Sequence, residues 1–489
     1  MMRYLAGLRN LSRVFCFLLL VQTAWAREPA PDLSRSLVRI TVTAQPFDYG
    51  RPWQGRRPQI KQGLGVLLSE QRILTSASLI ENAVHIWMLK ATGTDKYEGR
   101  VVAADFASDL ALLTADDDQL FSSLQALEIA PEPQIGDTLE ALQLEENGGA
   151  QQTKVNMNAV EIWRNPWGPV LIYRISGTLR FRMNHYTLPI LAKSKVVGML
   201  NWYRPENAEG GCSSLPFLNN FLERVASGQN PYPPKLGMSV TNRDSRELRK
   251  FRQVPPQLEG VFVDRVQADR SAAKGGILSG DLLLSVNGYK IDREGQVLHP
   301  RYGRIYWALI VPAEGKPGSG MPMTLWREGQ ELEVKVPMES YDPCDDVSPL
   351  MCPTRPPRYL MEGGFIFVEL SEPYLQQWGK AWQTQAPLRL LTYNAFQFEI
   401  FEIPRKIVVL AQVFPSEQTL GLSHKLSNAV IKTANGKTIL SLDDLAEALE
   451  SPKGEFQELE LEGEPYRLVF DAAQARELTP KLKKEYGIE

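Results

Sequence analysis

The sequence predicts a mainly β protein built from several domains. Between Ser36 and about Trp202, short apolar runs such as LVRITV, HIWML and VLIYRI alternate with turn residues, which is typical of an all-β sandwich or barrel. Farther along, Asn287-Gly288 and Asn435-Gly436 each stand between two apolar runs, and this dipeptide is a strong signal for a β-hairpin. A length of 489 residues gives room for three or four domains, at roughly 100–200 residues per domain.

The first 26 residues have the pattern of an export signal. Three arginines give a positive start, residues 14–21 form an apolar run, and Ala24-Trp25-Ala26 is a small-x-small cleavage site. The alternative is an uncleaved anchor, but the run is shorter than the ~20 residues that span a bilayer. We therefore expect an exported protein, periplasmic or extracellular, with no membrane span after cleavage.

The charge balance excludes nucleic acid as an expected partner. Removing residues 1–26 lowers the basic count from 54 to 51 against 57 acidic residues, a net charge near −6. A nucleic-acid-binding protein normally shows a basic stripe, and this chain has none. We also expect no cofactor.

Two cysteines in the proline-rich stretch DPCDDVSPLMCP are candidates for a disulfide. In an oxidising compartment Cys344 and Cys352 are expected to pair and close a small loop, whereas the alternative is two spare thiols in a linker. A metal site is not expected, because the chain has four histidines and none lies near these cysteines. Cys212 is then the unpaired cysteine.

Two stretches carry a resemblance to a known family. Residues 63–83 read GLGVLLSEQRILTSASLIENA and residues 105–113 read DFASDLALL. They resemble the HtrA/DegP-type trypsin-like serine proteases, whose matching stretches read ILTNNHVV and DPxSDLALL. The resemblance implies a trypsin-like double β-barrel over residues 34–228, closed by a helix at Leu215–Ala226.

The rest of the chain resembles PDZ domains. Residues 235–339 do so through GVFVDRVQADRSAAKGGILSGDLLLSVNG (residues 260–288), and residues 340–358 read as a linker. Residues 359–489 resemble the diverged second PDZ domain of the plant-type, two-PDZ branch of the same family. The expected fold class is therefore mainly β, with a trypsin-like double β-barrel followed by two PDZ-type α+β domains.

The resemblance places the triad at Ser78, Asp109 and Tyr186, where the family has histidine, aspartate and serine. A hydroxyl cannot act as general base at neutral pH, because its pKa is far too high. Asp109 is present, but it serves equally well to bond backbone amides between the barrels. His85, seven residues after Ser78, is interpreted as a spare strand histidine.

The nucleophile position is counted back from Pro189. The family motif GNSGGPL then falls on Asn184–Leu188 and Pro189, with His185 for asparagine and Thr187 and Leu188 for the two glycines. A slip of one residue puts His185 or Thr187 at the nucleophile position, and neither restores the motif. The lost glycines also put the oxyanion hole in doubt, because that site needs backbone N–H groups in a tight loop. We interpret Ser78, Asp109 and Tyr186 as vestigial triad positions and expect the protein to have no serine peptidase activity.

The first PDZ domain is expected to bind peptides by strand addition. Leu236-Gly237-Met238 matches the carboxylate-binding loop, and Ser239 and Val240 begin the strand that a ligand joins. A helix near Arg304–Ile310 is expected to form the opposite wall. Its pocket residues would be Ile305, Ala308 and Leu309. The alternative is a PDZ domain whose groove is closed or self-occupied.

The second PDZ domain offers only a weak loop candidate at Glu362–Phe365, so we expect a structural role for it. Phe47, Tyr49 and Trp53 lie where HtrA proteases build trimers from aromatic residues, which implies a homo-oligomer, although aromatic residues also cluster in ordinary loops.

The favoured hypothesis is an exported, non-catalytic HtrA-like protein that binds peptide C-termini or unfolded polypeptides. It would act as a scaffold, a chaperone or a regulator of an active paralogue in mixed oligomers. Two alternatives remain open. One is an active endopeptidase with a rearranged site made from Ser78, His185 and Thr187. The other is a structural envelope protein.

Overall fold

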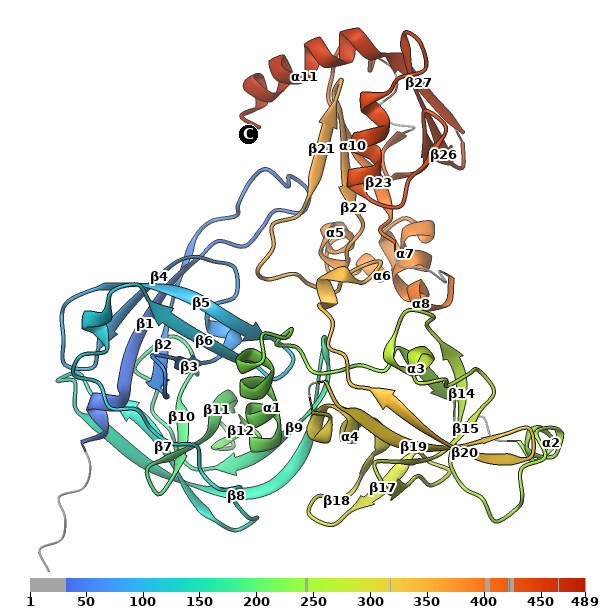
Figure 1. Ribbon diagram of the computed structural model, residues 1–489. Helices are drawn as coiled ribbons and strands as arrows, with labels where there is room; N and C mark the ends of the chain where they lie inside the picture. Colours follow the sequence, from blue (N-terminus) through green and yellow to red (C-terminus); the bar gives the residue numbers. More distant parts are fainter. Residues whose placement is uncertain are drawn as a thin grey trace, which may run out of the picture. The chain divides into compact units, whose positions relative to one another are not determined.

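The computed structural model describes residues 32–488, apart from 242–244, 317, 401–404, 421, 423–425 and 465. The expected export signal at residues 1–26 lies outside the described residues. From Leu33 onward the chain forms two closed β-barrels followed by two sheets that carry helices (Figure 1). The fold class expected from the sequence is confirmed. Within the described residues, no helix has both the length and the apolar character needed to cross a membrane.

The first barrel combines an alternating strand, β1, with strands that are buried over continuous runs. Along β1, LVRITVTA sends alternate side chains into the barrel core, because successive strand residues point to opposite faces. β6 is buried along its whole length, which fits its continuous apolar run LALLTA. The strand order is β1-β2-β3-β6-β5-β4. The bounds are β1 Leu37–Ala44, β2 Gln59–Leu67, β3 Ile73–Thr75, β4 Ala83–Lys90, β5 Tyr97–Asp105 and β6 Leu110–Ala115.

The second barrel closes in the order β10-β11-β12-β9-β8-β7. Its longest strand, β8, pairs with β7 along one half and with β9 along the other. The bounds are β7 Thr138–Leu144, β8 Ala150–Asn165, β9 Gly168–Ser176, β10 Pro189–Ala192, β11 Lys195–Arg204 and β12 Glu209–Ser213. Helix α1 follows at Leu215–Ala226, the bounds expected from its apolar spacing.

The first PDZ domain has the sheet order β13-β14-β15-β19-β20, with β16 paired to β15. The β15–β16 hairpin turns at Asn287-Gly288, and both residues have positive φ (48° and 83°), as a type I′ turn requires. The bounds are β13 Met238–Thr241, α2 Arg246–Phe251, β14 Val261–Val266, α3 Ser271–Lys274, β15 Leu282–Val286, β16 Tyr289–Lys290, β17 Gln296–His299, β18 Gly303–Tyr306, α4 Ile310–Glu314, β19 Gly320–Arg327 and β20 Gln330–Pro337.

The second PDZ domain repeats this order with one extra strand, β21, and with short helices inserted between β22 and β23 (Figure 1). The hairpin β24–β25 uses Asn435-Gly436, again with two positive φ angles. The bounds are β21 Tyr359–Glu362, β22 Phe365–Glu369, α5 Glu372–Leu375, α6 Trp382–Gln385, α7 Leu388–Ala395, α8 Gln397–Ile400, β23 Val408–Val413, β24 Ala429–Ala434, β25 Lys437–Thr438, α10 Leu442–Glu450, β26 Phe456–Glu462, β27 Arg467–Asp471 and α11 Ala472–Tyr486.

The first PDZ domain shares its hydrophobic core with the second barrel. Val170 and Ile172 of β9 and Phe217 of α1 belong to the same buried cluster as Trp307 and Val311. The side-chain amide of Asn220 in α1 donates to the carbonyl oxygens of Pro312 (3.0 Å) and Ala313 (2.9 Å) in α4. These contacts fix α4 against the closing helix of the second barrel.

The segment expected as a linker, residues 340–358, is ordered by specific contacts. A disulfide joins Cys344 and Cys352, eight residues apart. The Lys406 ammonium group donates to the carbonyl oxygens of Cys344 and Asp346 (2.6 Å each). Cys212 is a buried free thiol whose pKa is raised by burial.

Removing the disulfide is expected to lower the stability of the protein. In Cys344→Ser/Cys352→Ser, the free energy of unfolding should fall by about 2–3 kcal/mol, because a small closed loop no longer restricts the unfolded chain. Urea denaturation of the oxidised protein and of the double variant measures this difference. Cys212→Ser is a less suitable control, because it places a hydroxyl group in a buried apolar site. The reduced wild type is the matched comparison, and its free energy of unfolding should equal that of the double variant.

Two of the three aromatic residues expected at a trimer interface, Tyr49 and Trp53, contact the second PDZ domain of the same chain. The Trp53 ring lies edge-on to Tyr359 (5.9 Å between centroids) and to Phe414 (5.7 Å). Tyr49 belongs to the same cluster, and the Gln412 side chain donates to the Gly50 carbonyl oxygen. The loop between β1 and β2 is therefore packed against the second PDZ domain. This use of Tyr49 and Trp53 weakens the reason for expecting them in a trimer contact.

Candidate functional site

Asp109 is held between the two barrels by hydrogen bonds from both sides. It is the last residue of the turn between β5 and β6 and has φ +54°, a conformation that aspartate tolerates better than most residues. Its Oδ1 accepts a hydrogen bond from the Ser78 backbone N–H (2.7 Å), and its Oδ2 accepts one from the Asn201 amide (3.3 Å). Only 4% of its surface is exposed, and burial raises its pKa to about 6. Asp109 thus ties β11 of the second barrel to the first barrel.

Ser78 brings no imidazole to this carboxylate. It lies in the short 3₁₀ turn Ala77–Leu79, and its carbonyl oxygen accepts a hydrogen bond from Lys61 (3.0 Å). His85 belongs to β4, where its ring packs edge-on to Trp87 and its Nδ1 lies 3.7 Å from Glu98. Among the described residues, the hydrogen bonds to the Asp109 carboxylate come from Ser78 and Asn201, and none comes from a histidine.

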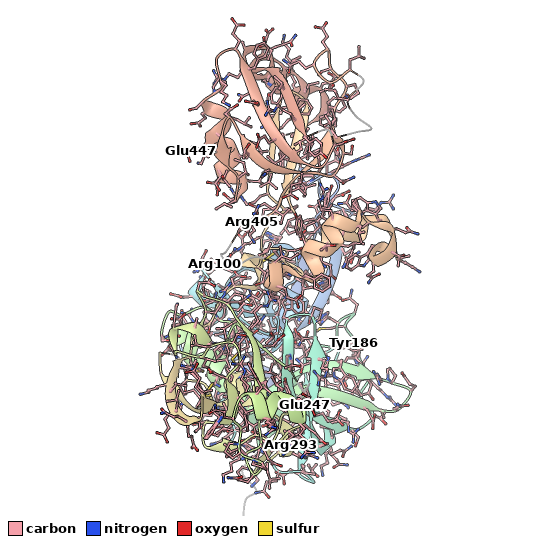
Figure 2. All side chains as sticks on the ribbon, turned by 90° about the vertical axis from the view of Figure 1, so that its right-hand side faces the viewer. Arg100, Tyr186, Glu247, Arg293, Arg405 and Glu447 are labelled. Atoms are coloured by element: carbon pink, nitrogen blue, oxygen red, sulfur yellow. A yellow bond between two sulfur atoms is a disulfide. The ribbon has the colours of Figure 1, made fainter. Side chains whose placement is uncertain are left out.

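The Tyr186 side chain packs on an aromatic neighbour and is partly exposed. It is 44% exposed at the surface of the second barrel (Figure 2), and its ring meets Phe181 edge-on at 5.1 Å. Among the described residues, no hydrogen bond joins its phenol to Asp109.

The next residue, Thr187, is buried. Its hydroxyl lies 2.5 Å from Nδ1 of His185, so an oxygen and a ring nitrogen are paired, yet only 1% of Thr187 is exposed. A Cβ added at Gly63 would come within 3.1 Å of Thr187, which shows how tightly the loop packs on β2. Burial, together with the nearby charge of Lys61, lowers the pKa of His185 to about 4.

A contact not expected from the sequence fixes this loop. The Asn184 side chain accepts a hydrogen bond from the Gln62 N–H (2.7 Å) and donates one to the Ile60 carbonyl oxygen (2.8 Å). The Leu64 N–H also donates to the Thr187 carbonyl oxygen (3.4 Å). The loop leaves a cavity of about 80 Å³ beside His185 and Thr187. Ligand pockets usually measure ≈ 300–1,000 Å³, so this one is too small for a peptide side chain and its backbone.

A much larger cavity lies at the first PDZ domain. It measures about 690 Å³ and is lined on one side by residues 236–240 and on the other by Trp307, Ala308 and Val311. β13 is the edge strand of its sheet, so one row of its backbone groups has no partner strand among the described residues. The carboxylate-binding loop and strand residues predicted from the sequence therefore line this cavity, together with Ala308.

Two predicted pocket residues lie elsewhere. Ile305 and Leu309 are buried in the domain core, 6% and 0% exposed, and do not line the cavity. The prediction was wrong because a helix was assumed from Arg304 onward, whereas β18 extends to Tyr306 and the helical turn begins at Trp307. That change of periodicity turns Trp307, Ala308 and Val311 toward the cavity.

Gly237 makes the close approach that the carboxylate-binding loop needs. Its φ is +69°, in the left-handed region, and a Cβ there would lie 2.2 Å from Cβ of Arg270. Arg270 itself is stacked on the Tyr341 ring, 3.9 Å from its centroid. Behind the loop, burial lowers the pKa of Lys235.

Parts of the cavity wall come from segments far away in the sequence. Residues Asn165–Val170 of the second barrel, Tyr341 and Asp346 of the disulfide segment, and Gln397–Glu399 of α8 all line it. Phe398 is 43% exposed, so its ring sits at the cavity without filling it. Nothing in the local sequence pattern connects these segments, which is why the prediction missed them.

The second PDZ domain has no equivalent open edge. By strand order β22 corresponds to β13, but β21 is already paired with its outer side. The loop candidate Glu362–Phe365 is the β21–β22 turn, and the Gly363 N–H donates to Thr479 of α11 (2.9 Å). These contacts favour the structural role expected for this domain. In the part of the chain that the structure describes, no group of three or more histidine, cysteine, aspartate or glutamate side chains is arranged for a metal ion.

Comparison with known sequences finds PDZ domains at both expected places. Two family models, each described as a PDZ domain, match residues 230–293 and 349–489. The chain is similar to Protease Do-like 2, chloroplastic, from Arabidopsis thaliana: 23% identity over 473 residues, 96% of this chain and 76% of the relative. It is also similar to Protease Do-like 4, mitochondrial, from the same plant: 22% over 457 residues, 93% and 84%.

A bacterial relative covers a shorter part. Serine endoprotease DegS from Haemophilus influenzae is 25% identical over 295 residues, which are 57% of this chain and 77% of the relative. Among solved structures, HtrA-type protease AlgW with decapeptide matches 64% of this chain and 98% of its own, at 16% identity and a TM-score of 0.45.

Proposed function

We propose that this chain, a homologue of HtrA/Deg-type trypsin-like serine proteases with PDZ domains, binds polypeptides without cutting them. The observation that carries the proposal is a contrast between two sites. The first PDZ domain has an open edge strand beside a cavity of about 690 Å³, whereas the crevice between the barrels holds a carboxylate without an imidazole. The cavity at the first PDZ domain is suited to bind a polypeptide, whereas the crevice lacks the imidazole that a serine protease needs to cleave one.

The crevice chemistry supports the non-catalytic part of the proposal. Acyl transfer by a serine protease needs an imidazole that takes a proton from the nucleophile and returns it. The neighbours of Asp109 are an amide N–H and a side-chain amide, and neither group accepts a proton at neutral pH. Asp109 therefore acts as a hydrogen-bond acceptor that joins the barrels, and Ser78 and Tyr186 stand as vestigial positions.

The second candidate function is an endopeptidase with a rearranged site. One observation favours it, namely the His185–Thr187 contact at 2.5 Å. Two observations weigh against it. Thr187 is 1% exposed, so a substrate carbonyl cannot reach its hydroxyl, and an imidazole with a pKa of about 4 is a weak base. The Thr187→Val variant tests this candidate directly, because it removes the hydroxyl of the His185–Thr187 pair. If this site were an endopeptidase, the variant would lose any peptidase activity that the wild type shows.

Peptide binding follows from the geometry of β13. An extended peptide can add to the edge strand through main-chain hydrogen bonds, while its side chains enter the cavity beside Trp307 and Val311. The loop at Gly237 offers backbone N–H groups to a terminal carboxylate, and such nests of N–H groups bind anions. The ligand class is thus a peptide C-terminus or an unfolded segment.

Gly237→Trp is expected to lower peptide affinity at least tenfold. The new side chain would meet Arg270 at once and push the loop away from β13. Fluorescence anisotropy with a labelled peptide library ending in a free carboxylate measures the loss. Gly288→Trp is the matched control, since Gly288 also has positive φ but has open space where a Cβ would lie. Equal affinity of wild type and Gly237→Trp would refute this binding site, and circular dichroism verifies that both variants fold.

The biological role that fits these properties is a scaffold, a chaperone or a regulator of an active protease, acting as a homo-oligomer or in mixed oligomers. A structural envelope protein would show no peptide affinity in the same titration. The expected export to a periplasm or to the medium rests on residues 1–26 alone. The relatives do not support it, since two of them are named chloroplastic and mitochondrial. N-terminal sequencing of the mature protein, with cleavage after Ala26 as the expected result, tests the export signal.

A further inference from the structure

Arg265 stands on the face of the sheet that borders the peptide cavity. Residues 261, 263 and 265 would share one face of a regular strand, but the register of β14 shifts between Val263, which is buried in the core opposite Val240, and Arg265, which lines the cavity. In the sheet Arg265 is the cross-strand partner of Ser239 on β13. A peptide added to the free edge of β13 would therefore place every second side chain on the face that carries Arg265, one strand away from its guanidinium.

The present partner of this guanidinium is a neutral group. Nη1 of Arg265 donates to the backbone carbonyl oxygen of Glu399, at the end of α8. Among the described residues Arg265 forms no ion pair with a carboxylate. Two carboxylates line the cavity: Asp346 lies among Lys235, Arg270 and Lys406, whose positive charges act on it, and Glu399 forms no ion pair among the described residues.

We propose that Arg265 makes the first PDZ domain selective for polypeptides that carry an aspartate or glutamate within the few residues joining β13. This inference rests on the proposed function and names its ligand class. A carboxylate is a stronger partner for a guanidinium than a peptide carbonyl, because the charge-assisted bond is about twice as strong and can be bidentate. An acidic side chain would displace the Glu399 carbonyl oxygen, and a basic one would be repelled.

The apolar wall completes the recognition. Met238, Val240, Trp307, Ala308 and Val311 border the same cavity, so an apolar ligand residue fits beside the acidic one. The chain's own α8 presents this combination in part, since Phe398 lines the cavity while the next residue holds Arg265 through its carbonyl oxygen. The expected ligand is thus an extended segment in which an acidic residue lies near an apolar residue.

The experiment titrates the full-length protein with fluorescein-labelled decapeptides that end in valine. Three sets carry Glu, Gln or Lys at each of the four positions before the terminus. We expect the best Glu peptide to bind about fivefold more tightly than its Gln counterpart, since a partly exposed ion pair contributes at most about a fivefold factor. The preference should shrink in high salt, because ions screen exposed charges.

Charge reversal at the same position supplies the decisive comparison. Arg265→Glu should make the Lys peptide the best ligand, and Arg265→Gln should abolish the preference while retaining binding. Arg293→Glu is the matched control. Arg293 is an exposed arginine of the same domain (Figure 2), and its Nη2 donates to a backbone carbonyl oxygen, that of Pro256 (3.1 Å), but it does not line the cavity.

The outcomes separate this inference from the proposed function. If no peptide of any set binds to the wild type, the proposed function fails. If all three sets bind equally and Arg265→Glu changes nothing, peptide binding stands and the role of Arg265 is overturned. If Arg293→Glu reverses the preference as strongly as Arg265→Glu, the selectivity comes from the overall charge of the domain and not from this contact.

Discussion

The variant Ser78→His/Tyr186→Ser is expected to remain without measurable peptidase activity, although it restores the two side chains that the triad lacks. A working triad contributes about 10⁶-fold to the rate, but only when the nucleophile loop presents its hydroxyl and its N–H groups to the substrate. Here the Asn184 amide binds that loop to β2 at two points. Thr187 and Leu188, which replace two glycines, are both buried. Position 186 is 44% exposed in a loop held in this conformation, so the new serine is not expected to reach a position beside Asp109.

Hydrolysis of a fluorescent casein measures this outcome. We expect the double variant to stay at least 10⁴-fold below a homologous active protease assayed alongside, because removing even one oxyanion-hole donor costs ≈ 10²–10³ in rate. A variant that also carries Asn184→Gly, Thr187→Gly and Leu188→Gly is the informative extension, since it frees the loop. Turnover by the two-residue variant, lost again when position 186 is changed to alanine, would show that the loop is competent as it stands.

Asp109→Asn is expected to stabilise the protein at pH 8 by about 3 kcal/mol. The carboxylate is 4% exposed, and burial raises its pKa from 3.8 to about 6, so its charged form is unfavourable in the folded state. One pKa unit corresponds to 1.36 kcal/mol. Asparagine keeps an oxygen for the Ser78 N–H, and its amide can donate to the Asn201 oxygen, which is buried without a partner. In a working triad the same substitution lowers the rate about 10⁴-fold.

The pH dependence has a definite sign. Because the folded pKa of Asp109 lies above the unfolded value, its stabilising contribution is complete below pH 4 and is lost as the pH rises through about 6. The advantage of Asp109→Asn should therefore be largest at pH 8 and should disappear near pH 4. Urea denaturation at pH 8, 6 and 4 measures it, with Asp95→Asn, an exposed position on the same barrel, as control. A loss of several kcal/mol at pH 8 would mean that the charge itself is needed there.

Local patterns in the sequence predicted the parts of the fold that local interactions determine. The alternation in LVRITVTA, the two Asn-Gly turns and the apolar spacing of Leu215–Ala226 each specify an element without help from distant residues. The prediction of a helix from Arg304 onward was wrong because it also relied on a local pattern alone. Alternation continues to Tyr306 before the helical turn starts, and the short run does not reveal where the period changes.

The site was predictable residue by residue but not as an arrangement. The positions of Ser78, Asp109 and Gly237 follow from motifs that lie within a few residues of each of them. The Asn184 contact with β2, the α8 wall of the cavity and the pairing of β21 with β22 depend on the tertiary structure. Asn184 and Gln62 are 122 residues apart, and no periodicity in either segment indicates that they meet.

The most direct test of the proposed lack of peptidase chemistry is to treat the purified wild-type protein with a fluorophosphonate probe at pH 8. Mass spectrometry then measures the mass of the intact protein. Without an activated hydroxyl in the crevice between the barrels, the mass should remain that of the unmodified protein. One adduct per chain, mapped to Ser78, Thr187 or any neighbouring residue, would contradict it.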